Sequence, residues 1–205
     1  LISIDEGAFS FSNISSITIP ASVKQIKQYA FYHCQHLEEV SFKKSSKLES
    51  IGKFAFANTM LLTFFFPENL VKFDKEWCNN IYYLRYIEVS PLNKCLSYID
   101  ENFIISKSNP NDDVFDSLLF VNRTAEKVKI PSFIKYIKSS SFYYCDKLQT
   151  IELPDDSQLV SIESNAFNFS SLKEFFVPKH VKVIKKNAFK NSNLASIKFC
   201  EDSEL

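Results

Sequence analysis

The chain has 205 residues, of which 45% are hydrophobic and 23% charged, and its 24 basic and 24 acidic side chains leave no net charge at neutral pH. A chain without a basic field has nothing to attract nucleic acid or an acidic membrane surface, so we expect neither as a partner. No apolar run approaches the roughly eighteen residues of a membrane-spanning helix, and we expect no membrane insertion by this segment.

A pattern of about 22 residues recurs along the chain. A copy contains Ala-Phe, as at Ala166-Phe167, then spaced apolar residues such as Phe175 and Val177, and often a proline such as Pro178. The phenylalanine position of successive copies is filled by Phe9, Phe31, Phe56, Cys78, Ile104, Phe142, Phe167 and Phe189. Self-similarity at such a fixed period predicts a solenoid of stacked repeats.

The spacing within one copy predicts its local structure. Phe175 and Val177 lie two residues apart and therefore point to one face of a short strand, which Pro178 ends. The pair Val181 and Ile184 predicts a second short strand, and the Ala-Phe segment predicts a turn or a 3-10 segment. One copy cannot bury enough apolar surface alone, so we expect a mostly β solenoid with parallel strands stacked in a curved array.

Three copies depart from the regular spacing. Polar turns at 43–48 and 155–159 lengthen two of them, and we expect these additions to fall in loops. Before Phe142 we expect a degenerate repeat containing Leu96, Ile99 and Ile104, followed by an insertion between Ile105 and Ala125 that forms a β-hairpin. The prediction is one array over 1–205 with about eight repeats and this irregular part around 91–127. Both ends fall inside a repeat, so we expect a piece of a longer array.

Two segments resemble a known family. The run 131–154 (PSFIKYIKSSSFYYCDKLQTIELP) and the run 23–37 (VKQIKQYAFYHCQHL) resemble the BspA-like, treponemal-type leucine-rich repeat. The resemblance extends over essentially the whole chain, with departures at Trp77-Cys78, Ile104 and Ser141. It implies a leucine-rich-repeat fold and a cell-surface or secreted protein, because members are typically such proteins of bacteria and parasitic protists. Some members are adhesins, which implies a protein or glycoprotein ligand.

The residues offer little for catalysis or metal binding. Cys34 and Cys145 both lie three residues after the phenylalanine position, which favours a small buried residue at each. His33 and His36 flank Cys34, but they should face solvent while the cysteine points inward, so we expect no metal site. Every histidine lies in a predicted turn, and no Gly-rich phosphate loop or G-x-S-x-G motif occurs. We expect no enzyme and no cofactor.

Binding is expected on the face that the stacked strands present. Residues between the core positions of each strand should point outward, and most are small or charged. Phe65, Tyr86 and Phe176 are the exceptions, and they suggest either contacts with a protein partner or cross-strand packing within a Phe-rich sheet. The charged residues of the face can also pair across neighbouring strands. The candidate ligand-binding residues are Phe65, Tyr86, Glu88, Lys127, Lys129, Thr150, Glu152, Glu174, Phe176 and Lys198.

Three sequons lie on predicted turns or the hairpin, and they make Asn13, Asn122 and Asn168 candidates for glycosylation. The resulting hypothesis is a non-enzymatic protein-interaction module of a surface or secreted protein, adhering to a host or extracellular-matrix protein or glycoprotein through its strand face. The alternative is a structural spacer or self-assembling segment without an external ligand.

Overall fold

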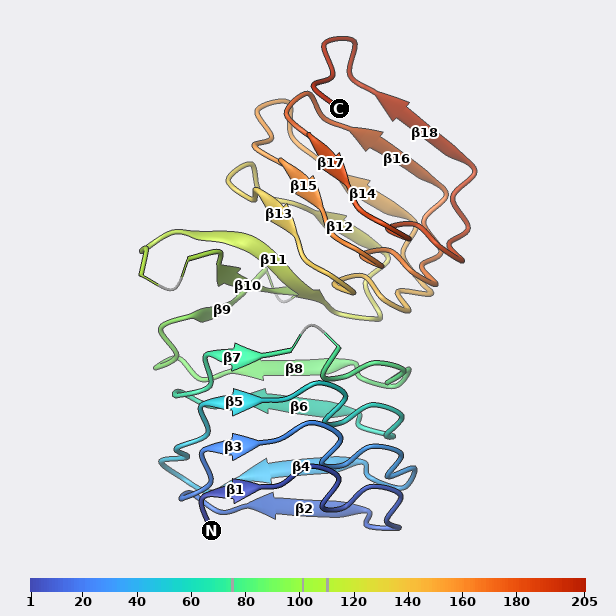
Figure 1. Cartoon of the computed structure of the whole chain (residues 1–205). Coiled ribbons are helices and arrows are strands. Elements are labelled where there is room, and N and C mark those ends of the chain that lie inside the picture. Colours follow the sequence, from blue (N-terminus) through green and yellow to red (C-terminus); the bar gives the residue numbers. More distant parts are fainter. Residues whose placement is uncertain (75, 101, 110) are drawn as a thin grey trace. The chain divides into compact units, whose positions relative to one another are not determined.

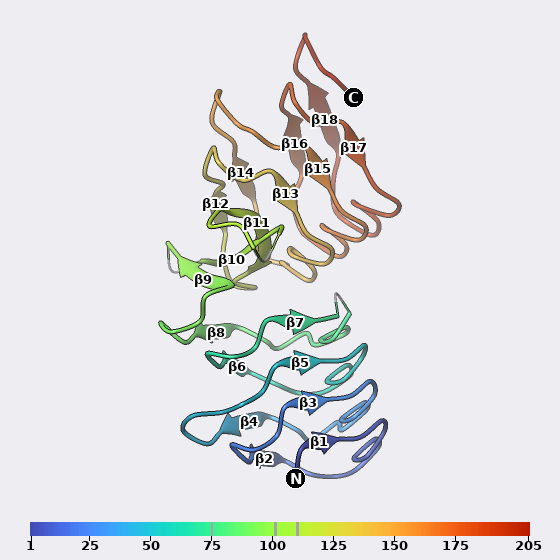
Figure 2. The same cartoon turned by 60° about the vertical axis from the view of Figure 1, so that its left-hand side comes forward.

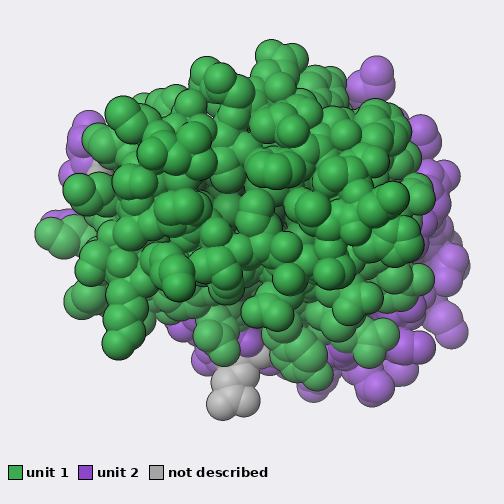
Figure 3. All heavy atoms as spheres, turned by 90° about the horizontal axis from the view of Figure 1, so that it is seen from below, with its two compact units in different colours: residues 1–94 green, residues 95–205 purple. Residues whose placement is uncertain are grey.

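A computed structural model describes residues 1–74, 76–100, 102–109 and 111–205. It divides into two compact units, unit 1 (1–94) and unit 2 (95–205), which Figure 3 shows in green and purple. The described residues form strands and turns and contain no helix. Each unit repeats the same two-strand motif, in which a short strand and a longer strand are joined by turns (Figure 1).

Unit 1 contains two sets of parallel strands (Figures 1 and 2). The short strands form one four-stranded sheet in chain order: β1 (Ser3–Ile4), β3 (Gln25–Ile26), β5 (Ser50–Ile51) and β7 (Lys72–Phe73). The longer strands form two separate pairs, β2 with β4 and β6 with β8: β2 (Ser16–Ile19), β4 (Glu39–Phe42), β6 (Thr63–Phe66) and β8 (Tyr86–Val89). Parallel stacking of successive repeats was predicted, and it is confirmed here.

Unit 2 repeats this arrangement after an irregular start. Its six-stranded sheet has the order β17-β15-β13-β11-β10-β9, from β9 (Leu96–Ile99), β10 (Phe103–Lys107), β11 (Phe115–Val121), β13 (Tyr136–Ile137), β15 (Ser161–Ile162) and β17 (Val183–Ile184). Its longer strands again form two pairs, β12 with β14 and β16 with β18: β12 (Lys127–Lys129), β14 (Thr150–Glu152), β16 (Glu174–Val177) and β18 (Ser196–Phe199). Both units are therefore stacks of β-solenoid turns.

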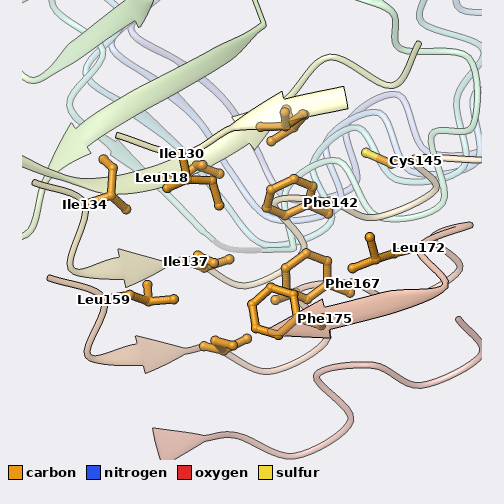
Figure 4. Packing of buried hydrophobic residues seen from close by; sticks show 14 of the residues in the cluster. Leu118, Ile130, Ile134, Ile137, Phe142, Cys145, Leu159, Phe167, Leu172 and Phe175 are labelled. Carbon is orange, nitrogen blue, oxygen red and sulfur yellow. The ribbon is translucent and has the colours of Figure 1, made fainter. Parts of the chain in front are cut away.

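The phenylalanines of the repeat form a stacked spine inside each unit. In unit 2 the ring centroids of Phe142 and Phe167 lie 4.6 Å apart, and those of Phe167 and Phe189 lie 4.8 Å apart. Figure 4 shows Phe142 and Phe167 among the aliphatic residues of the core. In unit 1, Phe31 stacks on Phe56 at 5.0 Å. Near-parallel stacking follows from the identical backbone position of each ring, and it carries the core from one repeat to the next.

The spine residue is held between two tight turns. The positions two before and two after it have positive φ, for example Tyr29 (58°) and His33 (56°) around Phe31, and Asn165 (58°) and Phe169 (58°) around Phe167. The phenylalanine N–H donates to the next repeat, as Phe31 does to the Ala55 carbonyl at 2.7 Å. Positive φ favours Gly or Asn and breaks a 3-10 run, so the described Ala-Phe segments are turns.

The structure alters one spine assignment of unit 1. Cys78 does take the phenylalanine position in the backbone, because the Phe56 N–H donates to the carbonyl of Trp77, the residue in the alanine position. The aromatic ring, however, comes from Trp77, which is buried and packs against Phe56 at 6.1 Å and Phe64 at 4.7 Å. The larger indole reaches the core from the neighbouring position.

The prediction that Ile104 holds the phenylalanine position of a degenerate repeat is wrong. Ile104 lies in β10, which pairs antiparallel with both β9 and β11, so the predicted hairpin is present but is one part of a three-stranded antiparallel segment. Val121 holds the phenylalanine position instead, since its N–H donates to Ser141, the alanine position of the next repeat. The middle of β11 joins the stack too, with Leu118 beside Ile137 of β13. Apolar spacing alone did not distinguish a solenoid turn from a buried antiparallel strand.

Candidate interaction surface

The residues that alternate with the core positions on the longer strands point away from the core. In β6 and β16 the exposed and buried side chains alternate strictly, so that Phe64 and Phe175 are buried while Phe65 and Phe176 are exposed. Strand periodicity alone accounts for this, since successive side chains point to opposite faces. All ten predicted strand-face residues are exposed.

On unit 1 the surface consists of β6 and β8. Phe65 lies opposite Glu88, and Thr63 lies opposite Tyr86, so the two aromatic residues are diagonal neighbours. Tyr86 is 64% exposed and Phe65 is 38% exposed. Two aromatic side chains open to solvent beside one carboxylate form a small amphipathic patch.

On unit 2 the first strand pair is dominated by charges. Lys127 lies opposite Thr150 and Lys129 lies opposite Glu152, while the Lys127 ammonium reaches diagonally to the Glu152 carboxylate at 2.6 Å. The charged residues of the face were expected to pair across strands, and this pair does so. An exposed pair of this kind contributes at most about 1 kcal/mol to stability. It also leaves this part of the surface without a strong net charge.

The second strand pair of unit 2 carries the most exposed phenylalanine of the face. Phe176 is 51% exposed and lies opposite Lys198, whose ammonium is 3.7 Å from the Glu174 carboxylate. The ring contacts among the described residues include none at Phe65, Tyr86 or Phe176. These rings therefore do not pack on another described ring, and packing against non-aromatic neighbours on the adjacent strands stays the alternative explanation.

Each unit has a hollow where the ladder of longer strands is interrupted. β14 and β16 belong to different sheets, and between them lies a cavity of about 430 Å³ lined by Thr150, Glu174, Phe176 and Lys198 among others. β4 and β6 are separated in the same way, beside a cavity of about 270 Å³ that Phe65 lines. The short-strand sheets continue past both places. Four of the predicted residues are thus brought together at one hollow.

The two interruptions share a sequence feature that apolar spacing within one repeat does not reveal. In each, a repeat with a polar insertion (43–48 or 155–159) is followed by one whose strand begins one residue sooner after the spine. The spine-to-strand step falls from nine residues (Phe142 to Ile151) to eight (Phe167 to Phe175). This difference alone does not separate the strands, since β2 and β4 pair although their steps are eight and nine residues. The insertions were expected to fall in loops, and they do, while the short-strand sheet continues past them.

The cysteines and histidines do not converge on a reactive site. Cys34 and Cys145 are fully buried, as predicted, and the Cys34 thiol donates to the Phe9 carbonyl at 2.9 Å. Burial raises the pKa of the Cys145 thiol, against a smaller opposing effect of the Arg123 guanidinium 3.7 Å away. Among the residues that the structure describes, no group of histidines, cysteines and carboxylates has the arrangement of a metal site.

The sequon asparagines lie in different settings. Asn13 is exposed, whereas Asn122 and Asn168 are half-buried. The Asn122 side chain accepts from both the N–H and the hydroxyl of Thr124, and the Asn168 side chain accepts from Asn191 at 3.3 Å. All three remain predictions as glycosylation sites.

Comparison with known protein families and structures agrees with the solenoid fold. The model of the BspA type leucine rich repeat region matches residues 2–109 and 109–204 in six copies, and the chain belongs to this family. No curated protein matches the chain significantly. The crystal structure of the pneumococcal vaccine antigen PcpA is similar to it, with 26% identity and a TM-score of 0.78, over 98% of this chain and 55% of that one.

Two further bacterial structures share the fold. A leucine-rich-repeat protein of Eubacterium ventriosum has 20% identity and a TM-score of 0.77, over 97% of this chain and 57% of that one. A leucine-rich cell surface protein of Faecalibacterium prausnitzii has 18% identity and a TM-score of 0.68, over 91% and 60% of the two chains. This chain therefore spans less than two thirds of each of the three. Of the described residues, none belongs to a helix long and apolar enough to cross a membrane.

Proposed function

We propose that the chain is a non-enzymatic protein-interaction module of a surface or secreted protein, which adheres to a host or extracellular-matrix protein or glycoprotein through its strand face. The supporting observation is that Phe65, Tyr86 and Phe176 are open to solvent on the longer strands and make no ring contact with another aromatic residue in the described part of the chain. Exposed aromatic residues in a polar surround are typical anchors of protein interfaces. The surface location rests on the family and on one similar bacterial protein that is described as a cell surface protein.

Two of these aromatic residues also line cavities that a partner side chain could enter. Phe176 forms part of the wall of the larger cavity, and Phe65 forms part of the wall of the smaller one. An inserted side chain of a partner would therefore contact an aromatic ring on one side and charged groups such as Glu174 and Lys198 at the rim. A desolvated centre with a polar rim is the usual anatomy of a binding patch.

The test is surface plasmon resonance of the purified chain against immobilised matrix proteins and host-cell surfaces. The double variant Phe65→Glu/Phe176→Glu is compared with Phe133→Glu, which changes an equally open phenylalanine in a turn. We expect saturable binding that the double variant loses by tenfold or more and that the control retains. Binding that survives the double variant would contradict the strand-face assignment.

The second candidate function is a spacer or self-assembling segment. Neutral net charge and exposed aromatic residues both favour association between copies. Light scattering after size exclusion separates the candidates, because a chain that binds no matrix protein and stays monomeric would be a spacer. Concentration-dependent dimers that the double variant abolishes would assign the strand face to self-association.

A further inference from the structure

Unit 1 has a second cavity, and none of its lining residues belongs to the longer strands. It has a volume of about 340 Å³ and is lined by the equivalent turns of three successive repeats: His33, Gln35, His36, Asn58, Thr59, Met60, Asn80, Tyr82 and Tyr83. This size lies at the lower end of the range of ligand pockets, which runs from about 300 to 1,000 Å³. The space suits a small ligand or the end of a larger one.

The backbone fixes the walls of this cavity. His33, Asn58 and Asn80 are the positions two after the spine, and all three have positive φ, between 56° and 58°. The His33 N–H donates to the Ala57 carbonyl and the Asn58 N–H to the Asn79 carbonyl, both at 3.0 Å. In addition, the Asn80 side-chain amide donates to the Asn58 side-chain oxygen at 3.0 Å. The backbone of these turns and the Asn58–Asn80 pair are therefore held in place before any ligand binds.

The lining contains no charged carboxylate, ammonium or guanidinium group, although 23% of the chain is charged. Its polar groups are amides, imidazoles and hydroxyls, which offer both donors and acceptors. Tyr83 is 42% exposed and Tyr82 45% exposed, so aromatic surface is open at the same place. A matching ligand is neutral, has several hydroxyl groups and has an apolar C–H face.

We propose that this cavity binds a neutral pyranose sugar, either free or at the end of a glycan. Sugar hydroxyls both donate and accept, and so match the donor and acceptor atoms of the Gln35 and Asn58 amides. The C–H face of a pyranose can lie against a tyrosine ring, whose face carries partial negative charge. The lining has no lysine or arginine that could pair with an anionic sugar. A metal ion is disfavoured because the Cys34 thiol is buried and donates a hydrogen bond to the Phe9 carbonyl.

The test is ligand-observed NMR with the intact chain, using methyl glucopyranoside, methyl galactopyranoside and lactose up to about 20 mM, since single-sugar affinities near the millimolar range are detectable in this way. Glucuronate and glucosamine serve as charged probes. Immobilised neutral glycans form a second arm, and binding there without binding of the free sugars would assign the site to a glycan end. We expect at least one neutral probe to bind and the charged probes to bind at least tenfold more weakly.

Variants distinguish this site from the strand face. Tyr83→Ala and Asn58→Asp should each weaken sugar binding at least tenfold, because one removes the ring and the other adds a charge at a position that still accepts positive φ. Tyr86→Ala, on the strand face, should leave sugar binding unchanged. The inference is overturned if no neutral probe or glycan binds, if charged probes bind equally well, or if both cavity variants bind as the unchanged chain does. Loss of matrix binding in Phe65→Glu/Phe176→Glu is a separate result and bears only on the strand face.

Discussion

The chain has two glycines, and each is required for a different reason. Gly7 has a φ of +61°, two residues before the spine position Phe9, and a Cβ there would find its nearest neighbour 3.9 Å away. Gly52 lies where the chain passes the preceding repeat, and a Cβ would lie 2.5 Å from the backbone nitrogen of Gln28. Gly7 is thus needed for its conformation, whereas Gly52 is needed for its lack of a side chain.

These two requirements predict different costs. Gly52→Ala should lower the free energy of unfolding by about 2–3 kcal/mol, because the backbone of the neighbouring repeat must move. Gly7→Ala should cost about 1 kcal/mol and Gly7→Asn less, since asparagine tolerates positive φ. Urea denaturation of the three variants measures this. Equal loss in Gly52→Ala and Gly7→Asn would contradict the structural explanation.

The contacts of the Arg123 side chain predict a second effect of a single residue on stability. Its guanidinium is buried, donates to the carbonyls of Ser141 at 2.9 Å and Ser140 at 3.4 Å, and lies 4.1 Å from the centre of the Phe120 ring. It therefore joins the end of the hairpin to the first regular turn of unit 2. Arg123→Lys should lower the free energy of unfolding by about 1–3 kcal/mol, because an ammonium cannot reach both carbonyls and stack on the ring.

The exposed Arg85 provides the matched control for Arg123. Arg85→Lys makes the same chemical change at the surface and should alter stability by less than about 0.5 kcal/mol. Thermal and urea unfolding of both variants give the comparison. A similar small effect in Arg123→Lys would mean that the buried guanidinium contributes little to the joint between hairpin and repeat.

At the scale of elements, much of the fold could be predicted because the spacing of apolar residues directly sets it. The strands β6 and β16 and the stacked rings of Phe142 and Phe167 follow from repeat spacing and strand periodicity. The role of Val121 could not be predicted in this way, because Ile104 has equally good apolar spacing and only pairing with β9 and β11 removes it from the stack.

The candidate surface was predicted in part. Exposure of Phe65 and Phe176 follows from strand alternation, which is local. The hollows beside them lie where neighbouring longer strands belong to different sheets, and strand pairing is a property of two repeats together. The cavity at Tyr83 likewise needs three turns to be stacked before it exists.

A side-chain contact between neighbouring turns also predicts that the stability of the fold depends on pH. His180 is hydrogen-bonded to the Glu204 carboxylate at 2.8 Å, and this contact, rather than the opposing effect of desolvation, lowers the pKa of Glu204 below its usual value of 4.5. A carboxyl whose pKa is lower in the folded state stabilises the fold fully above its usual pKa, and this stabilisation is lost as pH falls through the folded value.

Thermal unfolding between pH 7 and pH 3 tests this contact. His180→Gln should lower the melting temperature slightly at neutral pH, and its difference from the unchanged chain should shrink as Glu204 becomes protonated. His36→Gln, which changes an exposed histidine of another repeat, is the control. A difference that stays constant down to pH 3 would show that the carboxylate is not the group responsible.

At the scale of the whole molecule, some of the opposite charges form local pairs between repeats. Asp5 and Lys27 are 2.6 Å apart, and Glu163 and Lys185 are also 2.6 Å apart. Each of these pairs joins a residue to its equivalent in the next repeat, 22 positions later. Charges neutralised over such short distances produce little field beyond a Debye length of about 8–10 Å. Long-range electrostatic attraction is therefore a poor basis for capture of a ligand by this chain.

This charge distribution predicts how binding through the strand face responds to salt. If Phe65 and Phe176 supply the contacts, raising NaCl from 0.05 to 0.5 M should change the affinity for a matrix protein by less than about threefold, since apolar burial is not screened. Lys127→Gln/Lys198→Gln should change the affinity equally little, because both lysines are paired within the chain. A loss of tenfold or more in high salt, or in the lysine variant, would instead show that charged residues carry the interaction. The aromatic residues would then be secondary even with their exposure unchanged.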